Sequence, residues 1–338
     1  MLNQILNRFK HLTITLLIIA GGFFFLSSCA TPLFDRKSML FRSEEYVVYR
    51  LKKKKTPTML AEMFLGDKKR SWVIEDANEN VAFKKGEVIV IPLKEKNKGG
   101  LTVDGFQVVP ILSYHRFADN CDSPLCLPAR VFDQQMKYLK ENGYRVISLG
   151  ELHEFLKYRN SLPKRSVVIS IDDGYRSVYN IAWPILKKYD FRATFFIYTD
   201  FVGVSKNAIT WDQLREMKKS GFEIGAHTMS HCDLTRQNKG EDTEAYISRI
   251  EKELSMSKQI IDKKLNQNTV FLAFPYGRYD QRVLEMCKRL GYKIAVSVKR
   301  GSNPFFADPL ALRRSQILKR DIKSFISRLK TFNKLSLE

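Results

Sequence analysis

Acidic and imidazole side chains follow two apolar runs of the sequence, where they could bind a metal ion. The run from Val167 to Ile171 has the continuous apolar character of a buried parallel strand, and Asp172-Asp173-Gly174 follows it directly. His227 and His231 follow another such run, and a spacing of four residues places two imidazoles on one face of a helical turn. Two neutral imidazoles with one carboxylate suit Zn²⁺ or a related divalent ion and leave the open position of a catalytic site. We therefore expect Asp173, His227 and His231 to hold a metal ion.

Neighbouring groups would supply the rest of a hydrolytic site. Adjacent residues of a strand point to opposite sides, so Asp172 can help to activate a water molecule while Asp173 binds the ion. A further apolar run leads into Pro275-Tyr276-Gly277, where proline fixes the turn and the backbone N–H of Tyr276 can serve as an oxyanion donor. Cys232 could be a fourth ligand, but an idle thiol is the preferred interpretation. The alternative is a set of ordinary charged loops after strands.

Alternating strand-like and helix-like runs surround these residues and must position them. Because the alternation extends over about 230 residues, we predict an α/β fold, a parallel (β/α)7-type barrel rather than an open sheet. Side chains at the carboxyl ends of such strands meet at one edge of the barrel. The expected strands are 108–112, 145–148, 167–171, 193–198, 222–225, 270–274 and 293–297, and the expected helices include 131–142, 175–189, 211–219, 241–265 and 278–290.

Three of these segments together resemble the NodB-type polysaccharide deacetylases, carbohydrate esterase family 4. Ser170-Ile-Asp-Asp-Gly174 matches the first motif of that family, His227 to His231 the second, and Phe274-Pro-Tyr-Gly277 the third. The resemblance extends from about Val108 to Ile317. It implies a distorted βα barrel that removes acetyl groups from N-acetylglucosamine units. The implied cofactor is a divalent ion, Zn²⁺ first, with Co²⁺ or Ni²⁺ as alternatives.

One departure from the family concerns the arginine that steadies the catalytic base. The family often has arginine two places before the proline of the third motif, and this chain has Ala273 there. Arg313 or Arg314 could replace the missing arginine, and the sequence alone does not decide between them.

A second departure concerns the general acid, which in the family is usually a histidine late in the chain. No histidine follows His231 here. The pattern resembles the subgroup that includes the biofilm poly-N-acetylglucosamine deacetylases, in which the acid histidine comes from the first strand in a segment like Tyr114-His115. That resemblance predicts that His115 protonates the leaving amine; the alternative is a structural histidine at a strand end.

The start of the chain has the pattern of an export signal. Arg8 and Lys10 precede the apolar run 12–26, and Leu26-Ser-Ser-Cys29 resembles a bacterial lipobox; the alternative is an uncleaved anchor with an incidental cysteine. The mature chain would begin at Cys29 and be held at a membrane by acyl chains in the cell envelope outside the cytoplasm. Ala30 after the cysteine favours the outer membrane if the organism is Gram-negative.

Composition and charge limit the class of protein and of partner. The 338 residues are 44 % hydrophobic and 28 % charged, which excludes collagen-like and wholly disordered chains. Removal of the signal, which holds two cations and no acid, leaves +19 of the +21 net charge. Outside the cytoplasm that charge suits anionic wall polymers or lipid headgroups, and no nucleic acid is expected. Cys121 and Cys126 could pair in an oxidising compartment or remain free thiols.

Residues 46–93 form a separate small unit in which strand-like runs enclose two short helical runs. The expected strands are 46–51 and 87–92, and the expected helices are 58–65, with an N-capping threonine, and 71–78. This order resembles a LysM module, a binder of N-acetylglucosamine polymers, although Lys52-Lys-Lys-Lys-Thr-Pro57 replaces the usual opening. A basic scaffold without a ligand is the alternative. The predicted organisation is signal 1–28, lipidated tether 29–45, LysM-like module 46–93, linker 94–106 and deacetylase domain 107–338.

Three functions are compatible with these features. The first is metal-dependent hydrolysis of N-acetyl groups from an extracytoplasmic polysaccharide, peptidoglycan or a poly-N-acetylglucosamine-like polymer, with release of acetate. The second is a catalytically silent, wall-tethered glycan-binding lipoprotein, and the third is a basic adhesin for anionic polymers. The intact Asp-Asp pair and the two histidines favour the first; no protein partner is predicted.

The lipobox leads to a direct prediction. Cys29→Ala should abolish lipid attachment, because that cysteine would carry the acyl chains. Metabolic labelling with a fatty acid measures the effect, and equal labelling of the wild type and the variant would contradict it.

Overall fold

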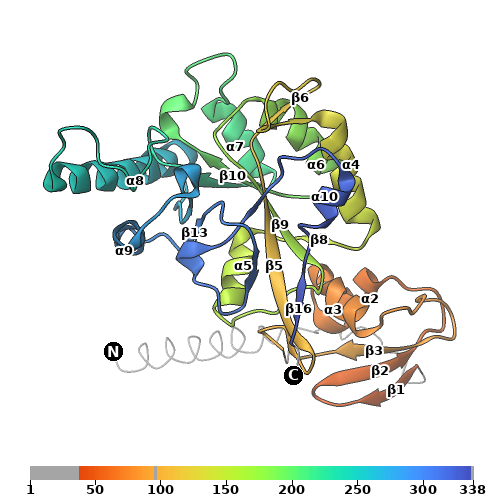
Figure 1. Ribbon diagram of the computed structural model, residues 1–338. Helices are drawn as coiled ribbons and strands as arrows, with labels where there is room; N and C mark the ends of the chain where they lie inside the picture. The colour runs from red at the N-terminus through yellow and green to blue at the C-terminus, as the bar shows by residue number, and fades with distance from the viewer. Residues whose placement is uncertain (1–37, 95–96, 336–338) are drawn as a thin grey trace, which may run out of the picture. The chain divides into compact units, whose positions relative to one another are not determined.

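The computed structural model describes residues 38–94 and 97–335 of the chain. The chain divides into two compact units at Lys94/Glu95, inside the predicted linker 94–106 (Figure 1). The predicted signal and Cys29 lie outside the described residues. Among the described residues, no helix combines the length and the apolar character that crossing a membrane requires.

The small unit is an antiparallel sheet covered on one face by two helices. Strand β2 (Tyr46–Arg50) lies between β1 (Met39–Arg42) and β3 (Val88–Pro92). The helices α2 (Pro57–Leu65) and α3 (Ser71–Ala77) lie between β2 and β3 in the chain, in the predicted order. β1 is an addition, since its residues were predicted to belong to the tether 29–45. The core consists of Val47, Tyr49, Leu51, Leu60, Ala61, Ile74, Ile89 and Ile91.

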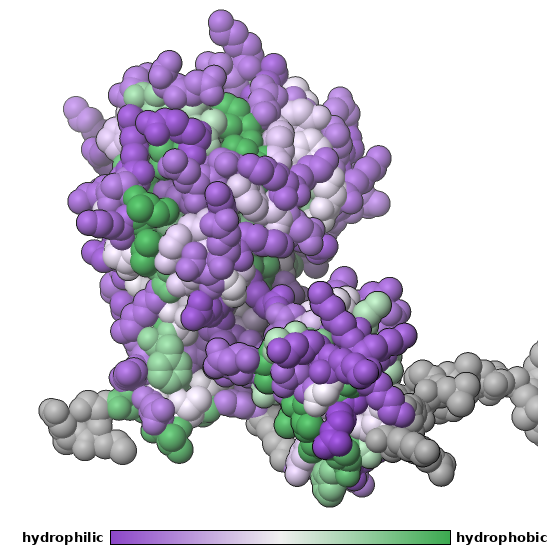
Figure 2. All heavy atoms as spheres, turned by 90° about the vertical axis from the view of Figure 1, so that its right-hand side faces the viewer, coloured by the Kyte–Doolittle hydropathy of each residue, from purple (hydrophilic) through white to green (hydrophobic). Residues whose placement is uncertain are grey.

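The other face of this sheet keeps apolar side chains in contact with solvent. Because successive strand residues alternate between faces, Tyr46, Val88 and Val90 point away from the core, and all three are exposed. Figure 2 shows hydrophobic side chains gathered on the surface of the small unit, whereas the larger unit is mainly hydrophilic on the face in view.

Six parallel strands form the central row of the larger unit, and nearly all of their residues are buried. Their order is β13-β12-β11-β10-β9-β5. The bounds are β5 (Gly105–Tyr114), β9 (Ser166–Ile171), β10 (Thr194–Ile197), β11 (Glu223–Ala226), β12 (Phe271–Ala273) and β13 (Ile294–Val296).

A seventh parallel segment closes the row into a barrel. Leu312 forms a parallel bridge with Val296 of β13, and β15 (Ser315–Gln316) pairs in parallel with β5. The closure agrees with the predicted (β/α)7-type barrel, but the prediction assigned the wrong segment to one strand. Residues 145–148 contribute only β8 (Arg145–Val146), which pairs with the start of β9 and is not part of the central row. The closing segment was missed because Arg313 and Arg314 interrupt its apolar character.

Helices cover the strands and agree with the predicted ones. They are α4 (Ala129–Glu141), α6 (Trp183–Lys188), which a π-helical turn precedes, α7 (Trp211–Lys219), α8 (Thr243–Leu265) and α9 (Gln281–Arg289), together with the unpredicted α5 (Leu149–Leu156) and α10 (Ile322–Ile326). Short strands complete the unit: β4 (Leu101–Thr102), β6 (Arg116–Ala118), β7 (Cys126–Pro128), β14 (Ser302–Pro304) and β16 (Phe332–Lys334).

Candidate active site

The two aspartates after β9 diverge because the backbone turns sharply between them and the next element. Asp173 has φ +83° and Gly174 has φ +101°, both in the left-handed region. Asp172 is 2 % exposed and faces the barrel interior, whereas Asp173 is oriented toward the two histidines. The different environments agree with the expectation that the two carboxylates have different roles.

The two histidines converge through an irregular loop and not through a helical turn, which corrects the sequence-based expectation. His227 follows directly after β11, and the next residue, Thr228, has φ +67°. His231 has φ +62°, and its backbone N–H donates to Thr228 Oγ1 at 3.0 Å. Left-handed backbone at threonine and histidine is strained, and such strain is concentrated at functional sites.

Asp173, His227 and His231 are brought together as the sequence predicted. Both Nε2 atoms lie 3.6 Å from Asp173 Oδ1, and the ligand atoms of all three side chains lie within 4.8 Å of one another. In a tetrahedral zinc site with bonds of about 2.0–2.1 Å, the ligand atoms are about 3.3 Å apart. The observed group therefore needs only small adjustments to hold a divalent ion.

A backbone carbonyl fixes the orientation of His227. The Nδ1 atom lies 2.8 Å from Ala273 O, and since a carbonyl only accepts, Nδ1 carries the hydrogen. Nε2 is then the unprotonated nitrogen of the neutral imidazole, and it faces Asp173. This is the arrangement by which metal-binding histidines are usually oriented. The donor set and its supporting bond thus fit a metal ion.

Glu253 on α8 binds the loop between the two histidines, a role that was not predicted from the sequence. It is 6 % exposed; Oε2 accepts hydrogen bonds from the backbone N–H groups of Met229 and Ser230, and Oε1 accepts one from Ser230 Oγ at 2.7 Å. The sequence contained a signal for it, because Glu253 lies among the buried apolar positions of an amphipathic helix.

Arg314 makes a bidentate ion pair with Asp172, whereas the sequence left open whether Arg313 or Arg314 would do so. Nη1 donates to Asp172 Oδ1 and Nη2 to Oδ2, each at 2.7 Å, and the guanidinium is fully buried. Nη1 also lies 3.1 Å from Ser170 Oγ, and Nε donates to Ser297 O. Arg314, and not Arg313, therefore occupies the role that Ala273 cannot fill.

This ion pair controls the charge of Asp172. Burial favours the neutral acid, but the charge and hydrogen bonds of Arg314 outweigh it and lower the pKa of Asp172 to about 2. Since this pKa lies below that of an unfolded aspartate, the pair stabilises the fold above pH 4. That stabilisation is lost as the pH falls toward 2. Asp172 is thus a carboxylate, able to accept a proton, throughout the neutral range.

His115 lies directly after β5, next to Asp172. Its Nε2 is 4.0 Å from Asp172 Oδ2, and its side chain is 11 % exposed. Burial lowers the pKa of His115, while the charges of Asp172 and Asp173 oppose that shift. The structure therefore places the predicted acid beside the predicted base.

Tyr276 closes the site beyond β12. Its φ of +59° turns the chain sharply, and its half-exposed ring packs edge-on against the His231 ring at 4.9 Å. Gly277 is required here, because a Cβ would lie 2.4 Å from Val298 N. The residue predicted to supply the oxyanion donor thus has its ring beside a predicted metal ligand.

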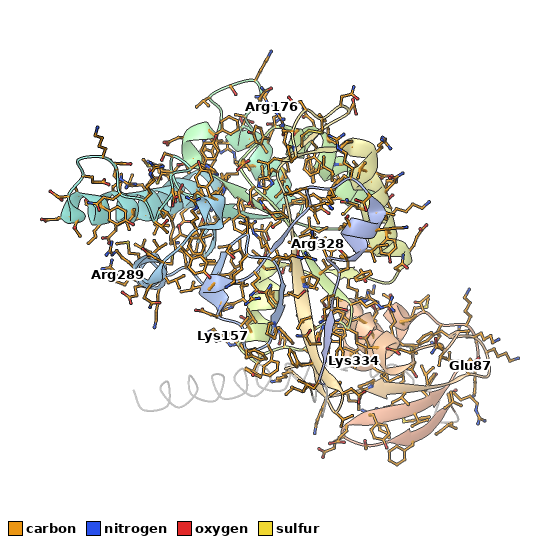
Figure 3. All side chains as sticks on the ribbon, in the orientation of Figure 1. Glu87, Lys157, Arg176, Arg289, Arg328 and Lys334 are labelled. Atoms are coloured by element: carbon orange, nitrogen blue, oxygen red, sulfur yellow. A yellow bond between two sulfur atoms is a disulfide. The ribbon has the colours of Figure 1, made fainter. Side chains whose placement is uncertain are left out.

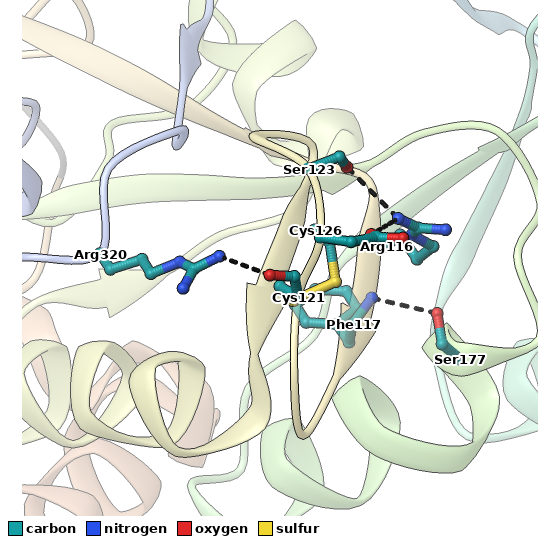
Figure 4. The surroundings of a disulfide bond; sticks show 8 residues. Arg116, Phe117, Cys121, Ser123, Cys126, Ser177 and Arg320 are labelled. Carbon is teal, nitrogen blue, oxygen red and sulfur yellow. Dashed lines mark hydrogen bonds and ion pairs between the residues drawn. A yellow bond between two sulfur atoms is a disulfide. The ribbon is translucent and has the colours of Figure 1, made fainter.

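The structure also shows the state of Cys121, Cys126 and Cys232. Cys121 and Cys126 form a disulfide between β6 and β7 (Figure 4). Cys232 is a free thiol with Sγ 3.7 Å from Arg249 Nη1. Among the described residues, the group that could hold a metal consists of Asp173, His227 and His231.

Comparison with known proteins decides the family. A profile described as Polysaccharide deacetylase matches residues 159–295. YxkH of Bacillus subtilis, assigned by name to the polysaccharide deacetylases, is 30 % identical over 209 residues, which cover 62 % of this chain and 71 % of that protein. The chain belongs to the polysaccharide deacetylases. It is accordingly a hydrolase, a polysaccharide N-deacetylase.

Other polysaccharide deacetylases support the same assignment. The poly-beta-1,6-N-acetyl-D-glucosamine N-deacetylase of Staphylococcus aureus is 34 % identical over 173 residues, which are 50 % of this chain and 59 % of that protein. Streptococcus pyogenes deacetylase PplD in complex with acetate is 31 % identical, with a TM-score of 0.59 over 66 % of this chain and 98 % of that one. IcaB from Ammonifex degensii, 24 % identical with a TM-score of 0.59 over 67 % of this chain and 97 % of that one, shares the fold.

The Arg314–Asp172 pair leads to a prediction for the pH dependence. Arg314→Gln should raise the pKa of Asp172, because burial then acts without the opposing cation. The acid limb of the kcat/KM profile should move to higher pH while the metal content stays constant. Arg313→Gln is the matched control. An unmoved acid limb in folded Arg314→Gln would contradict the positioning role.

Proposed function

We propose that this deacetylase performs metal-dependent hydrolysis of the N-acetyl groups of N-acetylglucosamine units in an extracytoplasmic polysaccharide, with release of acetate. One observation carries the proposal above the others. The Nδ1–H of His227 is committed to Ala273 O, so its Nε2 faces Asp173 and His231 as a ligand would, beside the ion-paired carboxylate of Asp172.

The chain supplies a base in the form needed at neutral pH. A divalent ion held by Asp173, His227 and His231 would supply Lewis acidity, which lowers the pKa of a coordinated water toward 7. Asp172 accepts the proton of the attacking water, and Arg314 keeps the carboxylate ionised and fixed in orientation. The water then adds to the acetamide carbonyl carbon.

Two further groups act on the charges that develop. The backbone N–H of Tyr276 donates to the carbonyl oxygen as it becomes an oxyanion, which its place against His231 supports. His115 donates a proton to the leaving nitrogen, so that the C–N bond breaks to give acetate and an amino sugar. Its position 4.0 Å from Asp172 supports this role.

The substrate and the location follow from separate lines of support. The named activity of the Staphylococcus aureus relative supports a β-1,6-linked N-acetylglucosamine polymer. The strand–helix–helix–strand order of residues 46–92 supports a LysM-like glycan-binding module, which favours peptidoglycan. The lipobox at Cys29 supports a lipid anchor in the cell envelope. The runner-up, a silent glycan-binding lipoprotein, would release no acetate from any of these polymers.

The ligand assignment predicts that metal content and activity fall together. His231→Ala removes one of three ligands and should lower both bound Zn²⁺ and acetate release, because two ligands make a poor site. Asp172→Asn should keep the metal and lose turnover. Elemental analysis with an acetate assay, on variants shown to be folded by thermal unfolding, separates the two. Full zinc occupancy in His231→Ala would refute the assignment.

The acid role of His115 predicts a change in the alkaline limb of the pH–rate profile. Only the protonated imidazole can donate, and its pKa is lowered by burial, so the wild-type limb should lie at or below neutral pH. His115→Ala should slow turnover about 10²–10⁴-fold and remove that limb while the metal is retained. A wild-type rate with an unchanged limb in the metal-loaded variant would mean that the proton comes from another group.

A further inference from the structure

Two pockets lie among the loops that follow the strands of the barrel. The first, of about 540 Å³, is lined by residues that follow β5, β9 and β10, and the second, of about 520 Å³, by residues that follow β11 and β12. The two pockets therefore take their lining residues from different strands of the row β12-β11-β10-β9-β5. Among the lining residues are Arg116, Tyr175, Arg176 and Lys206 in the first pocket and Arg236, Lys239, Tyr276 and Arg278 in the second.

Each pocket is lined by residues that lie next to the predicted site. Arg116 directly follows His115, and its guanidinium lies 5.9 Å from the ring centre of Tyr175, which comes two residues after Asp173. The ring of Tyr276, in the second pocket, packs against His231. A polysaccharide bound with an acetamide at the metal site can therefore extend neighbouring sugar units into both pockets.

Both pockets have an excess of positive charge. Arg116 is paired with Asp122 and Arg278 with Asp233, so these four side chains neutralise one another. Arg249, which also lines the second pocket, is paired with Glu241. The remaining cations have no carboxylate partner among the residues that the structure describes: Arg176 and Lys206 in the first pocket, Arg236 and Lys239 in the second. Each pocket thus keeps two unneutralised positive charges next to the reaction.

A disulfide and several hydrogen bonds hold the loops of the first pocket in place. The disulfide closes the loop between β6 and β7, Arg320 donates to Cys121 O at 3.0 Å, and the Phe117 N–H donates to Ser177 Oγ at 3.1 Å (Figure 4). Arg176 is held by a bond from its Nε to Ala208 O, which leaves the terminal nitrogens of its guanidinium for a ligand. Preorganised cations of this kind favour carboxylates and phosphates.

We propose that the two pockets bind anionic groups on the sugar units that flank the reacting N-acetyl group. The proposal rests on the proposed deacetylation and narrows its substrate to a glycan that carries negative charge. Each deacetylation creates an ammonium group, which the four unpaired cations repel, so a polymer without acidic groups becomes a poorer ligand with every acetyl removed. Acidic groups on the flanking units offset that repulsion and keep the polymer bound.

The experiment compares one glycan with and without its charge. A muramyl-containing tetrasaccharide with free carboxylates and its methyl ester are assayed for acetate release, and the ratio of their kcat/KM values is the readout. The ratio should exceed one and decline as salt increases. Arg176→Ala/Lys206→Ala and Arg236→Ala/Lys239→Ala should each lower it about fivefold. A phosphate-bearing N-acetylglucosamine oligomer, assayed in parallel, distinguishes phosphate from carboxylate as the preferred anion.

A matched control and a binding measurement complete the design. Lys157 is an exposed cation at the end of α5, before the start of β9 and away from Arg176 (Figure 3), so Lys157→Ala should leave the ratio unchanged. A ratio of one in the wild type, or equal ratios in all variants, would overturn the proposal while acetate release still upheld the enzyme function. Calorimetry on the same two glycans gives the ratio of their binding constants without turnover. Absence of acetate release would therefore count against the proposed function alone.

Discussion

The buried pair of Arg314 and Asp172 connects the predicted catalytic base to the closure of the barrel. Arg314 lies on the segment between Leu312 and Gln316, which joins β13 to β5, and its guanidinium reaches Asp172 and also Ser297 O on the far side. Breaking a buried pair by removing one partner costs about 3–5 kcal/mol. The same contact therefore joins the closing segment to the residue that follows β9 and keeps the carboxylate of Asp172 ionised.

Strained backbone around the site depends on buried polar contacts for its stability. Asp173, Thr228, His231 and Tyr276 all have positive φ, each at a cost of about 1–3 kcal/mol. Glu253 accepts three hydrogen bonds from the loop between the histidines, and Ala273 O accepts one from His227. The surrounding fold thus sets the ligand geometry before any ion binds.

Residue types and spacing indicated the candidate groups because they follow apolar runs of the sequence. The structure places the predicted base, the three predicted metal ligands, His115 and the Tyr276 turn at one end of the barrel, as parallel strands require. The closing strand and the role of Arg314 were harder to predict from the sequence. Two adjacent arginines interrupt the apolar pattern of a short strand, and only the fold shows which of them is buried. The loop between the histidines was misjudged as a helical turn, since spacing alone does not distinguish a helix from a loop with left-handed residues.

Arg314 also acts on the electrostatics of the predicted acid. Asp172 Oδ2 faces Arg314 Nη2 at 2.7 Å and His115 Nε2 at 4.0 Å, so one carboxylate oxygen faces both groups. Burial and the charge of Arg314 lower the pKa of His115, whereas the carboxylates of Asp172 and Asp173 oppose that shift, so the protonated imidazole is a stronger acid than a free one. In the proposed mechanism, the attraction of Asp172 for the imidazolium would disappear when Asp172 takes up a proton from water. The proton on His115 would then be more easily released, at the stage when the leaving nitrogen requires it.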